Sequence, residues 1–127
     1  MRVISKLRLR QFWARPGQAA SEAVLQAWYG HVNSKTVTWH SWADVKAEYA
    51  SASIVGSCVV FNIGGNKYRL VVRIRYFTQK VFVLKVMTHE EYDDGKWKAD
   101  CGCFAPPPKV KAQPEKTGPG NGKRRKR

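Results

Sequence analysis

Two segments of the sequence carry side chains suited to holding a polyanion and moving protons. The first, Lys67–Phe77, is rich in β-branched and aromatic residues and predicts a strand. Because strand side chains alternate between the two faces, one face carries four cations: Lys67, Arg69, Arg73 and Arg75. Neighbours on that face lie about 6.5–7 Å apart, close to the spacing of phosphates along an extended nucleic-acid strand.

These cations do not stabilise one another, because like charges on one sheet face repel. An anionic partner would offset the repulsion, since arginine can hold two phosphate oxygens at once and lysine acts as a point charge. The alternative is a solvated face of an ordinary basic sheet, which is the better interpretation for an edge strand. For a central strand with four charged positions on one face, we favour nucleic-acid binding.

The second segment, Thr88–Asp93, follows the last predicted strand. Histidine changes its protonation state near neutral pH, so His89 is a candidate for proton transfer. Tyr92 lies three residues further on, and one helical turn would bring both side chains to the same side. The alternative is purely structural: Thr88 caps a helix and the tyrosine packs on the sheet edge. A His-x-x-Tyr spacing alone does not separate the two.

The elements that must position these side chains form helices first and strands afterwards. Ahead of the basic strand, the sequence predicts a strand Arg2–Ile4, a helix from Ser5 to about Trp13, a helix with Pro16 in its first turn and an apolar stripe over Gln18–Val32, and a short helix Trp42–Ala50. Flanking it are strands Ser57–Ile63 and Val81–Met87, with turns at Gly64-Gly65-Asn66 and Thr78-Gln79-Lys80. This order predicts an α+β fold with N-terminal helices packed on one face of a small antiparallel sheet.

Tryptophans are the other candidates for RNA contact, because bases stack on aromatic rings. A small core also needs large side chains, so we assign Trp28 to the core and expect Trp39 and Trp42 to cover one of its edges. Trp97 stays a candidate for stacking. The remaining histidines, His31 and His40, are expected at the surface or in packing roles.

The chain divides into a predicted domain, 1–103, and a predicted disordered tail, 104–127. The tail holds five of the six prolines and too few apolar side chains to offset the entropy of ordering it. The formal net charge of +14 divides equally, +7 in each part, because the tail has eight Lys or Arg against Glu115. Both parts are therefore basic, which favours a polyanionic partner, nucleic acid before acidic protein.

Other classes of protein fit the sequence poorly. No apolar run approaches the roughly 18 residues of a membrane-spanning helix, and the N-terminus lacks the apolar core of a signal peptide. We therefore expect a cytoplasmic protein whose cysteines, Cys58, Cys101 and Cys103, are reduced thiols. Although Cys101 and Cys103 are two residues apart, no second ligand pair follows at a recognisable spacing, so no metal site is expected.

Two motifs at a characteristic spacing resemble the HigB family of toxins within the wider RelE/ParE-like group. They are Val60-Phe61-Asn62-Ile63-Gly64-Gly65-Asn66-Lys67-Tyr68-Arg69-Leu70 and Val86-Met87-Thr88-His89-Glu90-Glu91-Tyr92-Asp93. The resemblance runs from about Met1 to Trp97. It implies a RelE-like fold and cleavage of mRNA, typically on translating ribosomes, without metal or other cofactor. It also implies inhibition by a HigA-type antitoxin with a helix-turn-helix domain.

The resemblance further implies that a 2′-hydroxyl attacks the adjacent phosphate, leaving a 2′,3′-cyclic phosphate and a 5′-hydroxyl. Arg69 would hold the scissile phosphate, while His89 and Tyr92 would act as acid, base or orienting groups. Lys67 and Arg73 would flank that phosphate, and we predict an RNA-binding set of Lys67, Arg73, Arg75 and Asn66. The acidic residues around Tyr92 and the Pro-rich basic tail depart from the family's usual pattern.

Three other functions remain open at this point. A noncatalytic RNA- or ribosome-binding protein would need the same basic face but no titrating group. A ParE-like gyrase poison would use the same fold, although the His89 and Tyr92 motif matches the ribonuclease branch. Third, the basic face could serve only to bind an acidic segment of an antitoxin.

Overall fold

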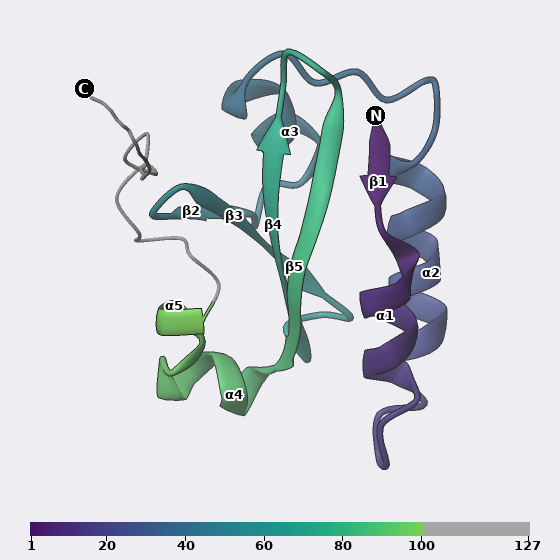
Figure 1. The fold of residues 1–127 in the computed structure, drawn as a ribbon, viewed down its shortest axis with the longest axis vertical. Coiled ribbons are helices and arrows are strands. Elements are labelled where there is room, and N and C mark those ends of the chain that lie inside the picture. Colours follow the sequence, from purple (N-terminus) through teal and green to yellow (C-terminus); the bar gives the residue numbers. More distant parts are fainter. Residues whose placement is uncertain (101–127) are drawn as a thin grey trace, which may run out of the picture.

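Five strands form one sheet in the order β1-β5-β4-β3-β2, with helices on both of its faces (Figure 1). The computed structural model describes residues 1–100, with side chains as far as Lys98. Along the chain the elements are β1 (Arg2–Ile4), α1 (Lys6–Trp13), α2 (Ser21–Val32), α3 (Trp42–Glu48), β2 (Ser53–Val55), β3 (Cys58–Ile63), β4 (Tyr68–Arg75), β5 (Lys80–Thr88), α4 (His89–Asp94) and α5 (Trp97–Asp100). The predicted domain end at residue 103 and the predicted tail 104–127 lie outside the described residues.

The predicted α+β class is confirmed, with α1 and α2 packed on one face of the sheet. Strands β2 to β5 pair antiparallel, whereas β1 pairs with β5 in parallel and makes the sheet mixed. Strand β2, a three-residue edge strand, was not predicted. The second helix was predicted to begin too early, because residues 15–20 form turns and α2 starts at Ser21, whose N–H donates to the carbonyl of Gln18.

The alternation predicted for the central strand is confirmed in β4. Tyr68, Leu70 and Val72 face the N-terminal helices and are buried in the main core. Trp28 is also buried there, with its ring centroid 5.6 Å from that of Phe61. This face provides the apolar contacts that hold the sheet against the helices, so the opposite face is left to carry the charged residues of β4.

The opposite face is not the open surface that the sequence suggested. A second, smaller core lies on it, where Val60, Val71 and Met87 pack against Trp97 at the start of α5. Trp97 is only 2 % exposed, so the prediction that it is available for base stacking is wrong. The apolar positions among the cations explain the difference, because they require a cover that the short C-terminal helices supply.

The cysteines differ from expectation where the structure describes them. Cys58 is buried in the second core and is disulfide-bonded, so the prediction of a reduced thiol at this position is wrong. The prediction rested on the expected compartment, whereas bonding depends on which sulfur atoms the fold brings together. Cys101 and Cys103, the pair that was considered and rejected as metal ligands, lie outside the described residues.

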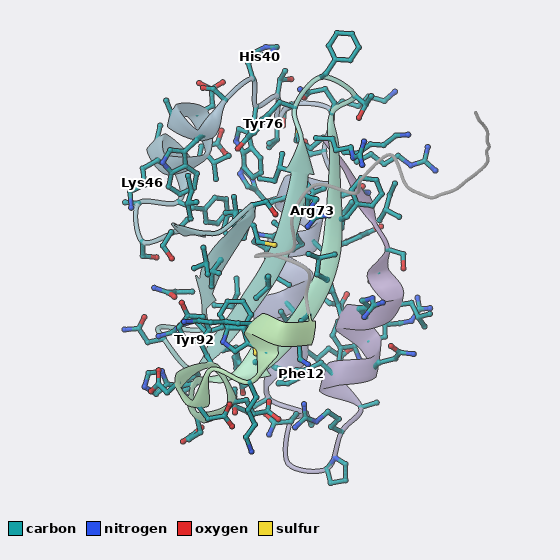
Figure 2. All side chains as sticks on the ribbon, turned by 60° about the vertical axis from the view of Figure 1, so that its left-hand side comes forward. Phe12, His40, Lys46, Arg73, Tyr76 and Tyr92 are labelled. Atoms are coloured by element: carbon teal, nitrogen blue, oxygen red, sulfur yellow. The ribbon has the colours of Figure 1, made fainter. Side chains whose placement is uncertain are left out.

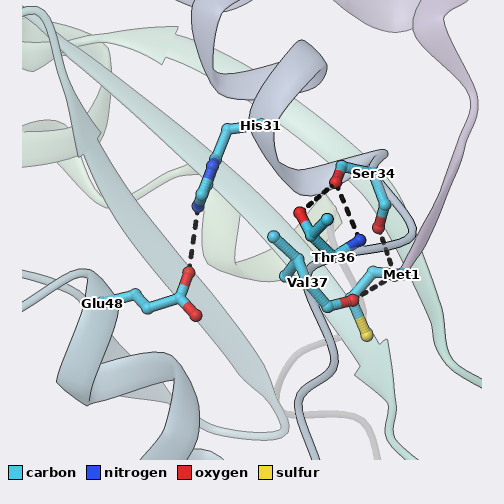
Figure 3. A network of polar contacts seen from close by, with 6 residues as sticks. All are labelled: Met1, His31, Ser34, Thr36, Val37 and Glu48. Atoms are coloured by element: carbon cyan, nitrogen blue, oxygen red, sulfur yellow. Dashed lines mark hydrogen bonds and ion pairs between the residues drawn. The ribbon is translucent and has the colours of Figure 1, made fainter.

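A network of polar contacts ties the N-terminus and the connection after α2 together (Figure 3). The amino group of Met1 donates to the carbonyl oxygens of Ser34 and Val37. Nearby, His31 of α2 and Glu48 of α3 form a contact of 3.0 Å between Nε2 and Oε1. His31 therefore has the surface, structural role expected of it. Among residues 1–100, no helix combines the length and apolar character needed to cross a membrane.

Candidate active site

The predicted catalytic residues meet at one end of the sheet, where β4 begins and β5 ends. In the β4–β5 pairing, Arg69 lies opposite Met87. Helix α4 starts directly after β5, and the backbone N–H of His89 donates to the carbonyl oxygen of Lys67 at 3.0 Å. Figure 2 shows Tyr92 at this end and Arg73 further along β4. The turn before β4 and the first turn of α4 are thereby held side by side.

Helix α4 has only six residues, and its start is fixed by a capping box. The Thr88 hydroxyl accepts from the backbone N–H of Glu91 at 3.2 Å, and the Glu91 carboxylate accepts from the backbone N–H of Thr88 at 3.0 Å. Arg15 of α1 adds an ion pair with Glu91 at 3.0 Å. Burial raises the pKa of Glu91, but the hydrogen bonds from Arg15 and Thr88 and the arginine charge lower it more, so the pKa lies below its ordinary value.

Arg69 is a buried cation without a carboxylate partner among the described residues. Its side chain is 9 % exposed. Nη1 donates to the carbonyl oxygens of Asn66 at 2.9 Å and of Tyr68 at 3.4 Å, and the guanidinium lies 5.2 Å from the centre of the Tyr92 ring. A buried charge without a counter-ion is costly, so this arrangement suits an anionic ligand that completes it.

The contacts of His89 determine which ring nitrogen carries its proton. Nη2 of Arg69 lies 3.2 Å from Nδ1 of His89, and a guanidinium can only donate, so Nδ1 accepts. Nε2 lies 3.0 Å from Oδ2 of Asp93, one helical turn further on, so Nε2 carries the proton and donates it. The imidazole is thereby held between the guanidinium of Arg69 and the carboxylate of Asp93.

Tyr92 lies beside the predicted catalytic residues and also has the structural role that the sequence left open. Its ring stacks on Trp97 with centroids 5.1 Å apart and planes inclined by 19°. Its carbonyl oxygen accepts from Nε1 of Trp97 at 2.9 Å. Thr88 does cap the helix, as the structural alternative required, yet the same cap places the tyrosine ring over Arg69. Packing on the second core thus fixes the orientation of the ring.

The four predicted RNA-binding residues divide into two pairs. Lys67 and Asn66 are exposed at the turn beside His89, where Asn66 has a left-handed backbone (φ 77°) and turns its carbonyl oxygen toward Arg69. Arg73 and Arg75 lie further along the strand, the latter about 20 Å from Arg69 at 3.4 Å per residue. Arg73 is half-buried and donates to the Ser57 hydroxyl at 3.2 Å, and Arg75 is exposed.

Sequence reasoning missed several residues that organise this site. Asp93 could have been found, because a helical spacing of four residues places it beside His89. Of the capping box, Thr88 was considered as a cap but Glu91 was missed, although the Thr-x-x-Glu pattern indicates both. The contact between Arg15 and Glu91 gave no local signal, because 76 residues separate the two in the chain.

Comparisons with known proteins identify the family of this chain. Over 34 residues the chain is 50 % identical to an mRNA interferase toxin HigB from Escherichia coli (strain K12), and equally to proteins named mRNA interferase HigB from Escherichia coli O157:H7 and Shigella flexneri. These matches cover 27 % of this chain and 33 % of each relative, so they span a third of the length of the curated relatives. Residues 21–95, more than half of the chain, match the family model described as HigB_toxin, the RelE-like toxic component of a toxin-antitoxin system. The chain therefore belongs to the HigB family of RelE-like toxins.

Proposed function

We propose that this chain is an mRNA interferase, an endoribonuclease that stops translation by cutting mRNA on the ribosome in the cytoplasm. The observation that carries the proposal is Arg69, a buried guanidinium that lacks a carboxylate within the described chain and contacts both an imidazole and an aromatic ring. A phosphodiester supplies the missing negative charge. The two proteins named as relatives from Escherichia coli carry this activity in their names.

The first step is binding of the scissile phosphate to Arg69. The phosphate approaches from the side of His89 and replaces Nδ1 as the partner of Nη2, because a charged acceptor makes the stronger hydrogen bond. Lys67 and Asn66 lie at the exposed rim of the same turn and contact the flanking backbone of the RNA. Freed from the guanidinium, Nδ1 then has a lone pair that can accept a proton.

The second step is transfer of the 2′-hydroxyl proton to Nδ1 of His89. The 2′-oxygen attacks phosphorus, the bond from phosphorus to the 5′-oxygen breaks, and that oxygen leaves as a hydroxyl. Asp93 stabilises the imidazolium formed at His89, since Nε2 already donates to its carboxylate. Tyr92, which also contacts Arg69, is assigned to the leaving oxygen, to which its phenol gives a proton.

The transition state carries more negative charge than the substrate, and Arg69 is the group that stabilises it. A cation already held by its neighbours needs no reorganisation when that charge develops. We propose that the reaction is metal-independent, because the guanidinium supplies the positive charge at the phosphate. The protein partner proposed for this toxin is a HigA-type antitoxin with a helix-turn-helix domain.

The experiment that tests this function is primer extension on transcripts after induction of the chain and of its Arg69→Ala variant. The wild type should arrest growth and leave discrete breaks in mRNA, whereas the variant should leave transcripts intact although it folds. Arrest without breaks would contradict the proposal and favour a noncatalytic ribosome-binding protein. Arrest with intact mRNA and a DNA-damage response would favour the gyrase poison.

A further inference from the structure

The other end of the β4–β5 hairpin presents the most exposed large apolar side chain of the described protein. Phe77 is 100 % exposed, whereas the next most exposed, Ile54 and Leu7, are 53 % and 49 % exposed. Figure 1 shows this turn and helix α4 at opposite ends of the sheet. A fully exposed phenyl ring contributes nothing to the core, so the fold itself gives no reason for a phenylalanine here.

The turn that carries Phe77 is firmly held. Nε2 of Gln79 donates to the carbonyl oxygens of Tyr76 and Trp39, both at 2.7 Å, which ties the turn to the segment before α3. The carbonyl oxygen of Gln79 accepts from the backbone N–H of Arg2 at 2.9 Å, which ties it to β1. The exposed ring therefore stands on an ordered support, which lowers the entropy cost of binding a ligand there.

Three cations lie in one row beside this turn. Lys80 of β5 is in register with Arg75 of β4 on one side and with Arg2 of β1 on the other. Facing residues in adjacent strands lie about 4.5–5.5 Å apart, so their like charges repel. No ion pair involves any of the three within the described part of the chain. The guanidinium of Arg75 lies 5.8 Å from the ring centre of Phe82, which adds a second aromatic side chain to the group.

We propose that this aromatic and basic group, Phe77 with Arg2, Arg75 and Lys80, is a second contact site for the single-stranded RNA that the active site cuts. A base stacks on the phenyl ring, and the three cations hold the adjacent phosphates. The proposal rests on the proposed function, because it takes the substrate to be RNA. Repelling cations around an exposed ring fit a polyanion better than the apolar pocket of a protein.

The geometry also gives the length of RNA that joins the two sites. Arg69 and Arg75 lie on the same face of β4, about 20 Å apart. At about 6.5–7 Å per phosphate, close to the spacing of alternate strand residues, this distance corresponds to about three nucleotides. The stacked base is thus expected about three positions from the cleaved bond, where it would set the minimum length of a tightly bound substrate.

The test measures binding of a fluorescently labelled 12-nucleotide RNA whose 2′-oxygens are methylated, so that it cannot be cut. Phe77→Ala should weaken binding about fivefold or more, the lower end of what one stacked base contributes. Phe77→Trp should retain or strengthen binding, and Leu7→Ala, the matched control, should leave it unchanged. Arg75→Gln should reduce the slope of log affinity against log salt by about 0.7, the value for one phosphate contact on a single strand.

A length series makes the test sharper. Shortening the RNA by three or more nucleotides on the side of the contact should weaken binding to the wild type and leave binding to Phe77→Ala unchanged. The proposal is overturned if Phe77→Ala binds the full RNA as the wild type does, or if it loses affinity only for an antitoxin protein. If the wild type cuts RNA and Phe77→Ala has no effect, only the proposal of this contact site is refuted. If the wild type neither binds nor cuts any RNA, the proposed function is refuted as well.

Discussion

Replacing Arg69 by methionine should separate catalysis from stability. The change removes two hydrogen bonds of 2.9 and 3.2 Å and a longer one of 3.4 Å, each worth about 0.5–1.5 kcal/mol net. It also removes a charge that is 9 % exposed. The desolvation of such an ion costs several kcal/mol, so removing it relieves that cost and stabilises the fold. These effects oppose each other, so the free energy of unfolding should change by no more than about 1 kcal/mol.

Cleavage should respond very differently to the same substitution. Loss of a group that stabilises charge in the transition state lowers the rate by about 10²–10³-fold. Arg69→Lys keeps the charge but loses the planar fork, so it should rescue only part of the activity. Arg10→Met, on the exposed surface of α1, is the matched control and should change neither quantity.

The assay combines urea unfolding, followed by tryptophan fluorescence, with the rate of cleavage of mRNA on ribosomes. Our reasoning fails if Arg69→Met retains activity within tenfold of the wild type. It also fails if the variant loses several kcal/mol of stability, because Arg69 would then be a structural residue whose loss of activity follows from unfolding.

Three further predictions concern helix α4. Asp93→Asn should slow cleavage only about two- to fivefold, because its contact with His89 is half-exposed and such pairs contribute about 1 kcal/mol or less. A loss of several hundredfold would mean that the carboxylate acts directly on the substrate. Tyr92→Phe should slow cleavage more than it weakens RNA binding, and equal losses would make the residue a binding group. The lowered pKa of Glu91 means that its carboxylate stabilises the fold above the ordinary glutamate pKa of 4.5, and that this contribution disappears as the pH falls through the lowered value. At pH 7, the free energy of unfolding of Glu91→Gln should therefore be lower than that of the wild type, by less than about 1 kcal/mol because the group is partly exposed. At acidic pH the two should unfold equally. The same difference at all pH values would mean that it does not come from the charge of Glu91.

Local patterns predicted much of this protein. Alternation along β4 gave the inner apolar face, which was found, and placed the cations on the opposite face, where a second core covers part of the strand. The spacing of His89 and Tyr92 is one that a helical turn would bring to one side, and the structure has such a turn in α4. Each of these features depends on residues close together in the chain, where side-chain periodicity decides the structure.

The features that the sequence did not show depend on distant residues. Nothing local indicates that β1 pairs with β5, or that Arg15 of α1 anchors α4 through Glu91. The burial of Arg69 was also missed: the ring of Tyr92 lies over its guanidinium, and that ring is itself held by stacking on Trp97. The candidate site is therefore more enclosed than a row of cations on a strand would suggest.

In the proposed mechanism, Arg69 and His89 direct a 2′-hydroxyl onto its own phosphate. The most direct test is to replace the nucleotide at the cut with its 2′-deoxy form and to identify the ends of the RNA produced on ribosomes. This mechanism requires that the unmodified RNA yields a 2′,3′-cyclic phosphate and a 5′-hydroxyl, and that one deoxy substitution abolishes the cut. Unchanged cutting of the deoxy substrate, or ends that carry a 5′-phosphate and a 3′-hydroxyl, would contradict it.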